Sequence, residues 1–516
     1  MQGPVAAGSS TPTEKEPIHT GRVITIAVIA ALGGFLFGYD SSVINGANKA
    51  VFYHFQITSS TLQGFAVAIA LLGSALGAFV GGRLTDKFGR KKVMVTAAIM
   101  FLVAGVGQAF PIALWDFMFW RVIGGFAIGL AAVVSPMYIS EVAPAHLRGR
   151  LSSLFQLAIV VGIFATQLVN QVIINLTPNE VEAPMLSPEV PPVEANNNLA
   201  LGLEAWQWMF LCMVVPAVIY WVLSLTVPES PRYLVATGQE DKAKSVLEQI
   251  YVDDVTPKVT AIHDSLSGEH KMSMSDIKGP SLGLLPIVWV GIILAILQQF
   301  VGINAVFYYS NVIWAAIGFD ESKAFFTSTI ISLVNVIFTF VAIAFIDRVG
   351  RKPLLLIGSV GMFVTLLVLT ITFVSAPQCT QALIDQGGTA GCTGVSEINT
   401  PLLSSTGGWI AVIMLNTYVA FFAATWGPIV WVLLGEMFPN RIRAAAMSIA
   451  VAANWLANYA VSQSFTSLIK MGLGVAYGLY TLGAFISIFY VWKFVKETKG
   501  VQLEDMEDLE GVKMKA

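Results

Sequence analysis

The chain has 516 residues, of which 55% are hydrophobic and only 12% are charged, whereas an ordinary soluble protein carries roughly 25% charged residues. This composition excludes a string of soluble domains, and a net charge of −3 argues against binding to nucleic acid. Three cysteines exclude a disulfide framework and a zinc ribbon. The composition therefore predicts an all-α protein that crosses a membrane many times.

Long apolar runs predict twelve membrane-spanning helices. Each run approaches the ~20 residues that cross about 30 Å of hydrocarbon. The runs are continuous rather than alternating, which excludes a β-barrel. The predicted spans are residues 23–45, 61–82, 92–113, 117–138, 152–175, 207–227, 284–308, 325–346, 353–375, 409–435, 444–466 and 472–494.

The distribution of Lys and Arg predicts that both termini lie in the cytoplasm, and we expect the membrane to be the plasma membrane. In that orientation 25 of the 29 Lys and Arg residues face the cytoplasm, 3 face outside, and Arg121 lies within a span. Such an excess of cytoplasmic positive charge sets the topology. It places the loops 176–206 and 376–408 outside, and it makes residues 1–20 and 496–516 cytoplasmic tails, the first of them polar and disordered.

Two motifs occur twice. GGRLTDKFGRKK at 81–92 is repeated as AFIDRVGRKPL at 344–354, and EVAPAHLR at 141–148 is repeated as EMFPNRIR at 436–443. Each copy follows the second or fourth span of its own group of six. Parallel repeats of this kind are typical of transporters whose binding site lies where the repeats meet.

The repeat divides the chain into an N-terminal half at 21–227 and a C-terminal half at 281–495. The segment 228–280 between them is too short for a catalytic domain. It shows the pattern of short amphipathic helices, with an apolar face formed by Leu234, Ala243, Val246, Leu247 and Ile250. We expect it to form a cytosolic helical domain beneath the membrane-spanning halves.

Two ionisable residues are predicted to lie at similar depth. Asp40 is about 17 residues into the first span, or roughly 25 Å from the cytoplasmic surface. Arg121 lies one to two helical turns after Asp116 in a span that enters from outside, so it is about 8 Å deep. Charge inside a bilayer is usually paired, and a pair that opens and closes could load and release a proton. The alternative is that both groups face water or cap helix ends near the surface.

Polar amides interrupt several apolar spans. Gln298, Gln299 and Asn304 lie in the seventh span, where Gly302 would permit a break in the helix. An unpaired amide in hydrocarbon costs several kcal/mol, so these groups should face partners or a water-filled cavity. Amides can both donate to and accept from sugar hydroxyls, although hydrogen bonding between helices is the alternative. The same reading applies to Gln156, Asn335 and Asn454.

Eight strings resemble the sugar porter family of the major facilitator superfamily. In chain order they are GYDSSVING, DKFGRKK, RVIGGFAIG, PMYISEVAPAHLRGR, PESPRYL, QQFVGINAVFYYS, DRVGRKP and GEMFPNRIR. They cover the chain from about residue 24 to 500. Two features depart from the family pattern: Lys496 stands where the family usually has Pro, and the outer loops are long.

The resemblance implies specific roles for the polar residues. Proton-coupled members carry Asp at the position of Asp40, which would act as the proton carrier with Arg121 as its regulator. The residues that would hold the sugar are Gln156, Gln298, Gln299, Asn304, Asn335, Asn454, Trp431 and Trp455, with Ile163, Phe307 and Tyr308 lining the path. Apolar side chains at Ile163 and Phe307 are typical of hexose carriers, although both can equally be packing positions.

The repeated motifs carry charges that the resemblance assigns to cytosolic salt bridges. These would latch the inner side when the transporter faces outward, as interface pairs bias a two-state equilibrium. Charge that only sets the topology is the alternative. The set is Asp86, Arg90, Glu141 and Arg148 in the first half, and Asp347, Arg351, Glu436 and Arg443 in the second.

The sequence thus predicts a major facilitator protein that imports a monosaccharide, such as the hexose glucose, by alternating access coupled to a proton. The alternatives are a proton-independent uniporter and a polyol, inositol or pentose symporter. No nucleophile–base pair, metal cluster or cofactor loop is evident, so we expect no enzyme activity, cofactor or metal. We expect a single chain to function as a monomer, and Cys379 and Cys392 to form a disulfide if the outer side is oxidising.

Overall fold

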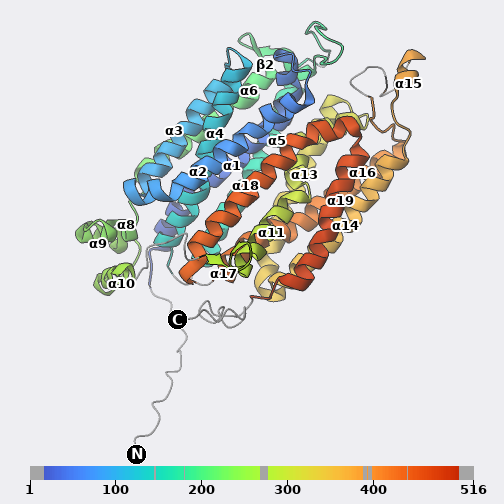
Figure 1. Ribbon diagram of the computed structural model, residues 1–516. Helices are drawn as coiled ribbons and strands as arrows, with labels where there is room; N and C mark the ends of the chain where they lie inside the picture. Colours follow the sequence, from blue (N-terminus) through green and yellow to red (C-terminus); the bar gives the residue numbers. More distant parts are fainter. Residues whose placement is uncertain are drawn as a thin grey trace, which may run out of the picture.

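The computed structural model describes residues 17–498, except 145–146, 179, 268–276, 388–391, 393–397 and 439. Long helices run side by side and form two groups, the first ending with α7 and the second beginning with α11 (Figure 1). Each of the twelve predicted spans coincides with one helix or with two consecutive helices. Because residues 1–16 and 499–516 lie outside the described residues, most of both predicted tails does as well.

The first helix begins next to residue 21, where the N-terminal half was predicted to start. Ile18 already pairs with Tyr251, and Thr20 opens the first helix. The sixth span is split between α6 and α7. The helices are α1 (Thr20–His54), α2 (Ser60–Phe88), α3 (Arg90–Ala109), α4 (Leu114–Val142), α5 (Arg148–Leu176), α6 (Ala205–Leu211) and α7 (Val214–Thr226).

The loop between α5 and α6 contains ordered structure that the sequence pattern did not predict. A 3₁₀ turn, η1 (Glu194–Asn196), is followed by an antiparallel hairpin of β1 (Asn198–Ala200) and β2 (Leu203–Glu204). The strands are too short to show an alternating pattern of burial. A second hairpin, β3 (Lys278–Gly279) and β4 (Gly283–Leu284), precedes the second group.

Three short helices connect the two groups, as the amphipathic pattern predicts. They are α8 (Pro231–Ala236), α9 (Glu240–Glu248) and α10 (Thr256–Ser267). Ser230 caps α8 by accepting a hydrogen bond from the backbone N–H of Tyr233. The predicted apolar face is confirmed, because all of its members are buried: Leu234, Ala243, Val246, Leu247 and Ile250.

The second group contains two broken spans. Gly302, with φ +86°, separates α11 from α12 and confirms the predicted break in the seventh span. Thr425 separates α16 from α17 in the tenth span, which the sequence did not indicate. The helices are α11 (Pro286–Phe300), α12 (Ile303–Ala316), α13 (Glu321–Val349), α14 (Arg351–Ser375), α15 (Gln381–Asp385), α16 (Ser405–Ala424), α17 (Trp426–Met437), α18 (Asn440–Met471) and α19 (Leu473–Phe494).

Eleven helical segments among the described residues are long and apolar enough to cross a membrane. They correspond to eleven of the twelve predicted spans. The remaining one, α18, is 32 residues long but carries buried polar side chains that lower its hydropathy, among them Asn454, Asn458 and Ser462. The fold is therefore the predicted all-α arrangement of twelve long helical elements.

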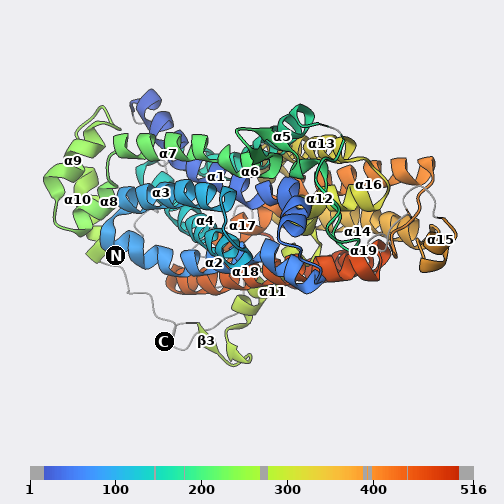
Figure 2. The ribbon, with the colours of Figure 1, turned by 90° about the horizontal axis from the view of Figure 1, so that it is seen from above.

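The molecule has two distinct ends. We call the end that carries β2 and α15 the loop end, and the opposite end, which carries α8, α9 and α10, the motif end (Figure 1). The two groups meet along three helix pairs, α1 with α12, α2 with α18, and α5 with α13. Figure 2 shows the first group, the second group and the seam between them from above.

Glycines let backbones approach closely within the first group. A Cβ at Gly125 of α4 would lie 1.9 Å from the carbonyl oxygen of Ala70 on α2, and one at Gly38 of α1 would lie 2.0 Å from that of Ile159 on α5. Small residues at helix contacts are the usual means of close packing in lipid. These contacts fix α1 and α4, the helices that carry Asp40 and Arg121.

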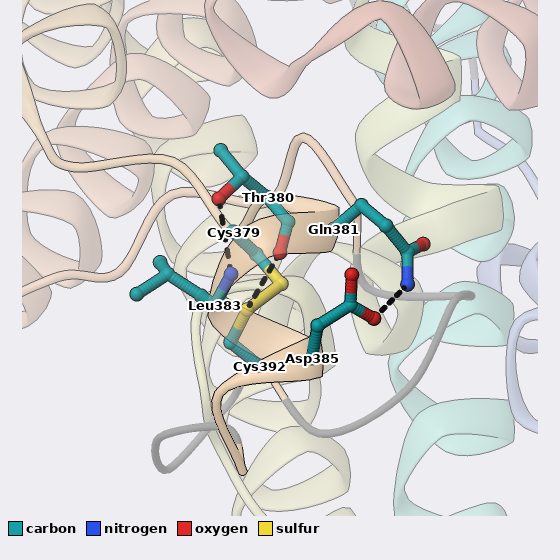
Figure 3. Close-up of a disulfide and its surroundings, with 6 residues drawn as sticks. All are labelled: Cys379, Thr380, Gln381, Leu383, Asp385 and Cys392. Carbon is teal, nitrogen blue, oxygen red and sulfur yellow. Dashed lines mark hydrogen bonds between the residues drawn. A yellow bond between two sulfur atoms is a disulfide. The ribbon is translucent and has the colours of Figure 1, made fainter.

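Cys379 and Cys392 are joined by a disulfide in the segment around α15 (Figure 3). The backbone carbonyl of Thr380 lies near Cys392, and the hydroxyl of Thr380 caps α15 by accepting from the N–H of Leu383. The bridge closes a loop of 13 residues. It joins Cys392 to the part of the chain that directly precedes α15.

Candidate functional site

The two ionisable residues predicted at similar depth are neighbours in the structure. Asp40 on α1 and Arg121 on α4 are both buried, and Arg121 Nη1 lies 3.9 Å from Asp40 Oδ1. Gln108 on α3 lies against both, because its Nε2 donates to Asp40 Oδ1 at 3.4 Å and its Oε1 accepts from Arg121 Nη1 at 3.3 Å. Sequence reasoning missed Gln108, although a lone amide in the apolar third span is the signal that singled out Gln298.

Backbone carbonyls hold the guanidinium in place. Arg121 Nη1 also donates to the backbone oxygen of Asp40, and Nη2 donates to that of Val67 on α2, at 3.3 and 3.2 Å. These contacts use the peptide groups of α1 and α2, whatever the protonation state of the carboxyl. The guanidinium of Arg121 is therefore held in place by backbone groups, while the carboxyl of Asp40 is the group that can gain or lose a proton.

Four of the predicted sugar-binding amides form one hydrogen-bonded cluster in the second group. Asn304 Nδ2 donates to Gln299 Oε1 at 2.6 Å, and Gln299 Nε2 donates to Asn454 Oδ1 at 3.1 Å. Asn454 Nδ2 donates in turn to Gln298 Oε1 at 2.9 Å. Gln298 Nε2 donates to the backbone oxygens of Trp426 and Gly427. The cluster links α11, α12, α17 and α18.

The aromatic candidates differ in their surroundings. Trp455, one residue after Asn454, is buried, and its ring lies 5.8 Å from that of Phe37 on α1. Trp431 on α17 is half-buried. The ring pair of Trp455 and Phe37 connects the second group, next to the amide cluster, with the helix that carries Asp40.

The remaining candidates form no hydrogen bond with the cluster among the described residues. Among the described residues, no hydrogen bond is made by the side-chain amides of Gln156 on α5 and Asn335 on α13, and Ile163 is half-buried on α5. Phe307 and Tyr308 are buried on α12. Amides without protein partners are the groups that a hydroxylated ligand can engage.

The two groups are joined at the loop end. Asn45 on α1 donates through Nδ2 to Ser310 Oγ at 2.9 Å, and its Oδ1 accepts from the backbone N–H of Asn311 at 3.1 Å. Farther out, Thr466 Oγ1 donates to the backbone oxygen of Ser60 at 2.6 Å. Between residues whose side chains the structure describes, every hydrogen bond from one group to the other lies in the loop half of the molecule.

The loop that contains η1 adds to this closure. The backbone N–H of Glu194 donates to Glu321 Oε2 at 2.7 Å, and that of Ala195 donates to Oε1 at 3.3 Å. Burial, together with the negative charges of Glu321 and Asp320, raises the pKa of Glu194 to about 7. The Glu321 carboxylate thus binds the backbone of η1 next to a carboxyl group, that of Glu194, which is mainly neutral below pH 7.

The motif end carries two equivalent ion pairs. Arg90 binds Glu141 through two nitrogens, at 2.8 and 2.9 Å, and Arg351 binds Glu436 in the same way, at 2.7 and 3.0 Å. Asp86 lies 3.5 Å from Arg90. Both bidentate pairs join residues of a single group. The side chains of Arg148, Asp347 and Arg443 lie outside the described residues.

Sequence reasoning missed two carboxylates that complete this symmetry. Glu229 accepts hydrogen bonds from the backbone N–H groups of Arg90 and Lys91, which open α3. Glu497 accepts from those of Arg351 and Lys352, which open α14. Carboxylates at helix N-termini are favourable because the N–H groups there lack helical partners. The signal was present as a third repeat, PES at 228–230 and KET at 496–498.

A change at Gly350 tests the geometry of this motif. Gly350 has φ +103°, and a Cβ would lie 2.7 Å from Glu497 Oε2. Gly350→Ala should therefore reduce the free energy of unfolding by about 2 kcal/mol. Thermal unfolding in detergent measures this, with Gly82→Ala on α2 as the control, because a Cβ there meets nothing within 4 Å. An equal melting temperature for the two variants would contradict the assignment.

The helices, the ion pair and the amide cluster together define the class of protein. The helices are long and apolar, a buried ion pair lies in one repeated group and an amide cluster in the other, and hydrogen bonds join the two groups in the loop half. Eleven helical segments among the described residues have the length and hydropathy that are needed to cross a membrane. The protein is a multi-pass membrane protein with a polar interior.

Comparison with known proteins gives the family. The model of the family "Sugar (and other) transporter" matches residues 26–509. The chain is 47% identical over 499 residues to the glucose transport protein of a Synechocystis strain, covering 96% of this chain and 99% of that protein. It is 34% identical over 525 residues to the D-xylose-proton symporter of Escherichia coli, covering 95% and 96%.

Solved structures agree with this result. The inward-open conformation of the xylose transporter XylE from E. coli superimposes with a TM-score of 0.73 at 33% identity, covering 94% of this chain and 99% of that one. The chain belongs to the sugar transporter family, and it is a multi-pass membrane transporter. The resemblance to sugar porters found in the sequence is confirmed.

Proposed function

We propose that the protein imports a hexose such as glucose together with a proton, by alternating access across the plasma membrane. The relative from Synechocystis is named for glucose transport, and relatives from E. coli and Bacillus subtilis are named as proton symporters of xylose and arabinose. The observation that carries the proposal is the buried pair of Asp40 and Arg121, because a buried carboxyl group beside a fixed cation can serve as a proton site.

The amide cluster is the proposed sugar site. With no sugar bound, Gln298, Gln299, Asn304 and Asn454 satisfy one another, so none of them is left as an unpaired group in the protein interior. A sugar can replace these contacts one for one, since each hydroxyl both donates and accepts. Trp431 and Trp455 would offer ring faces, and Gln156 and Asn335 would contribute from α5 and α13.

Helix α1 would couple the two sites. It carries Phe37 against Trp455 beside the amide cluster, then Asp40 against Arg121, and then Asn45 in the contact that fastens the loop end. Protonation neutralises Asp40 and weakens its attraction to Arg121. A small displacement of α1 would then act on the sugar site and on the loop-end contact together.

We infer that the motif end faces the cytoplasm and that both termini lie there. The excess of Lys and Arg at that end supports this orientation. Among residues whose side chains the structure describes, the hydrogen bonds that join the groups lie in the loop half, for example those of Asn45 and Thr466. The halves 21–227 and 281–495 would rock about the central seam, with the helical segment 228–280 beneath them, in a functional monomer.

The proposal is tested with purified protein in liposomes. Labelled glucose should accumulate above its external concentration when the outside is acidic, and a proton ionophore should abolish the accumulation. Equilibration that ignores the pH gradient would leave a uniporter. Uphill uptake of xylose but not of glucose would instead assign the pentose, for which the similar E. coli symporter is named.

The loop-end contact can be tested at Asn45. Asn45→Leu removes two hydrogen bonds to the second group, each worth about 1 kcal/mol. The ratio of closed to open loop ends should therefore fall about 30-fold. In a Cys212→Ser background, a cysteine at Ala315, which lines a small cavity there, should react faster with a membrane-impermeant thiol reagent.

The matched control for this change is Asn416→Leu on α16. Among the described residues, the Asn416 side chain donates only to the carbonyl of Val412 in its own helix, so its removal should leave labelling at residue 315 unchanged. If Asn45→Leu and Asn416→Leu label at the same rate, Asn45 does not fasten the loop end.

A further inference from the structure

Gln108 stands between the carboxyl and the guanidinium of the buried pair. It lies on α3, whereas Asp40 is on α1 and Arg121 on α4, and all three side chains are buried. Asp40 Oδ1 and Arg121 Nη1 are 3.9 Å apart, which exceeds the usual 2.7–2.9 Å of a charge-assisted hydrogen bond. The two ends of one amide occupy the remaining positions, with the N–H on the carboxyl and the C=O on the guanidinium.

The orientation of the amide matches the charge of each partner. An amide N–H next to the carboxyl stabilises its ionised form, and an amide oxygen next to the guanidinium satisfies one of its donors. If the amide were replaced by an apolar group, the carboxyl would lose the side-chain donor that lies within hydrogen-bond distance among the described residues. Gln108 therefore contributes to how readily Asp40 gives up a proton, without being the proton carrier.

The second carboxyl oxygen has different surroundings. Asp40 Oδ2 is buried and has no hydrogen-bond partner among the described residues. It faces Gly124 on α4, where a Cβ would lie 2.6 Å from Oδ2 and 3.2 Å from Gln108 Nε2. The absence of a side chain at Gly124 lets Oδ2 pack closely against α4, while Oδ1 is engaged by Gln108. Because Oδ2 has no donor among the described residues, it is the oxygen left to take up a proton.

We propose that Gln108 is a positioning residue for proton coupling, which holds Asp40 apart from Arg121 by contacting both and directs the proton to Asp40 Oδ2. This inference rests on the proposed proton symport. Besides Arg121 from α4, the titratable groups within electrostatic reach of the pair are Tyr308 and Tyr309 from α12. Neither tyrosine is removed by a change at Gln108, so the change isolates the amide.

The test is the pH dependence of glucose uptake by Gln108→Met in liposomes. Methionine keeps the length of the side chain and removes its hydrogen bonds. The external pH at which uphill uptake is half-maximal should rise by about one unit, because the carboxylate loses a stabilising donor. Glucose counterflow, which needs no net proton movement, should keep its KM within about twofold of the wild type.

A matched control and a second variant keep the test decisive. Gln171→Met changes another buried amide, whose one hydrogen bond to a described residue is with Asn175 in its own helix, and it should keep the wild-type pH profile. Gln108→Asn retains an amide too short to reach both partners, and it should show a smaller shift in the same direction. It decides the matter if Gln108→Met shows no counterflow.

The outcomes separate the inference from the proposed function. A wild-type pH profile in both Gln108 variants would overturn the role of Gln108, while symport would stand. A wild-type protein whose uptake ignores pH would overturn symport itself. If the KM for counterflow changes by as large a factor as the rate of uphill uptake does, Gln108 supports the sugar site rather than the proton site.

Discussion

Asp40→Asn should abolish uphill glucose accumulation while leaving counterflow intact. Asparagine keeps the size of the side chain and a contact for Gln108, but it cannot take up a proton. With one proton per sugar, a gradient of one pH unit supports about tenfold accumulation, since one unit is worth about 1.4 kcal/mol. The accumulation ratio in liposomes should fall from about 10 to 1 in the variant.

A control for this change is Asp116→Asn, close to Arg121 in sequence. Asp116 Oδ2 accepts a hydrogen bond from the backbone N–H of Ile112 in the turn before α4, so it has a structural role that does not involve the proton. Asp116→Asn should therefore still accumulate glucose. Uphill uptake by Asp40→Asn would show that the proton binds elsewhere.

Gln299→Ala should weaken glucose binding by about 100-fold. Gln299 is the central member of the amide cluster, because it accepts from Asn304 and donates to Asn454. Its removal takes away sugar contacts and the two hydrogen bonds that position Asn304 and Asn454, which together cost about 2–3 kcal/mol. Titration of purified protein with glucose, followed by tryptophan fluorescence, measures the Kd.

The same substitution at Gln171 provides the comparison for Gln299→Ala. Gln171 is a buried glutamine in a membrane helix, but it lies on α5 and bonds to Asn175. Gln171→Ala should bind glucose as the wild type does. A Kd within threefold of the wild type for Gln299→Ala would mean that the cluster joins helices and holds no sugar, which was the alternative reading of these amides.

The fold was predictable because its main signals are strong and local. Apolar runs located all twelve long elements, and the Gly302 break was visible as a glycine between polar residues. The break at Thr425 and the short hairpins could not be found in the same way. Thr425 leaves the helical conformation where its side chain meets Gly358 of α14, a contact between helices that are distant in sequence.

The site was predictable residue by residue only where a polar group stands out against an apolar span. Asp40 and Arg121 met that criterion, and so did the amides of the seventh span. Gln108 and Asn45 also met it, yet their importance depends on which helices lie beside them, and one sequence does not show that. Glu229 and Glu497 lie in polar segments, where a carboxylate has no contrast with its neighbours, so the short similarity of PES and KET was the one signal for them.

The most direct test of the central claim is sugar-driven proton movement. Liposomes that contain the protein, with equal pH on both sides and no membrane potential, receive glucose on the outside while a trapped dye reports the internal pH. Proton symport through Asp40 predicts that the interior acidifies with the wild type and stays constant with Asp40→Asn. Glucose entry without any change in internal pH would contradict the account and leave a uniporter.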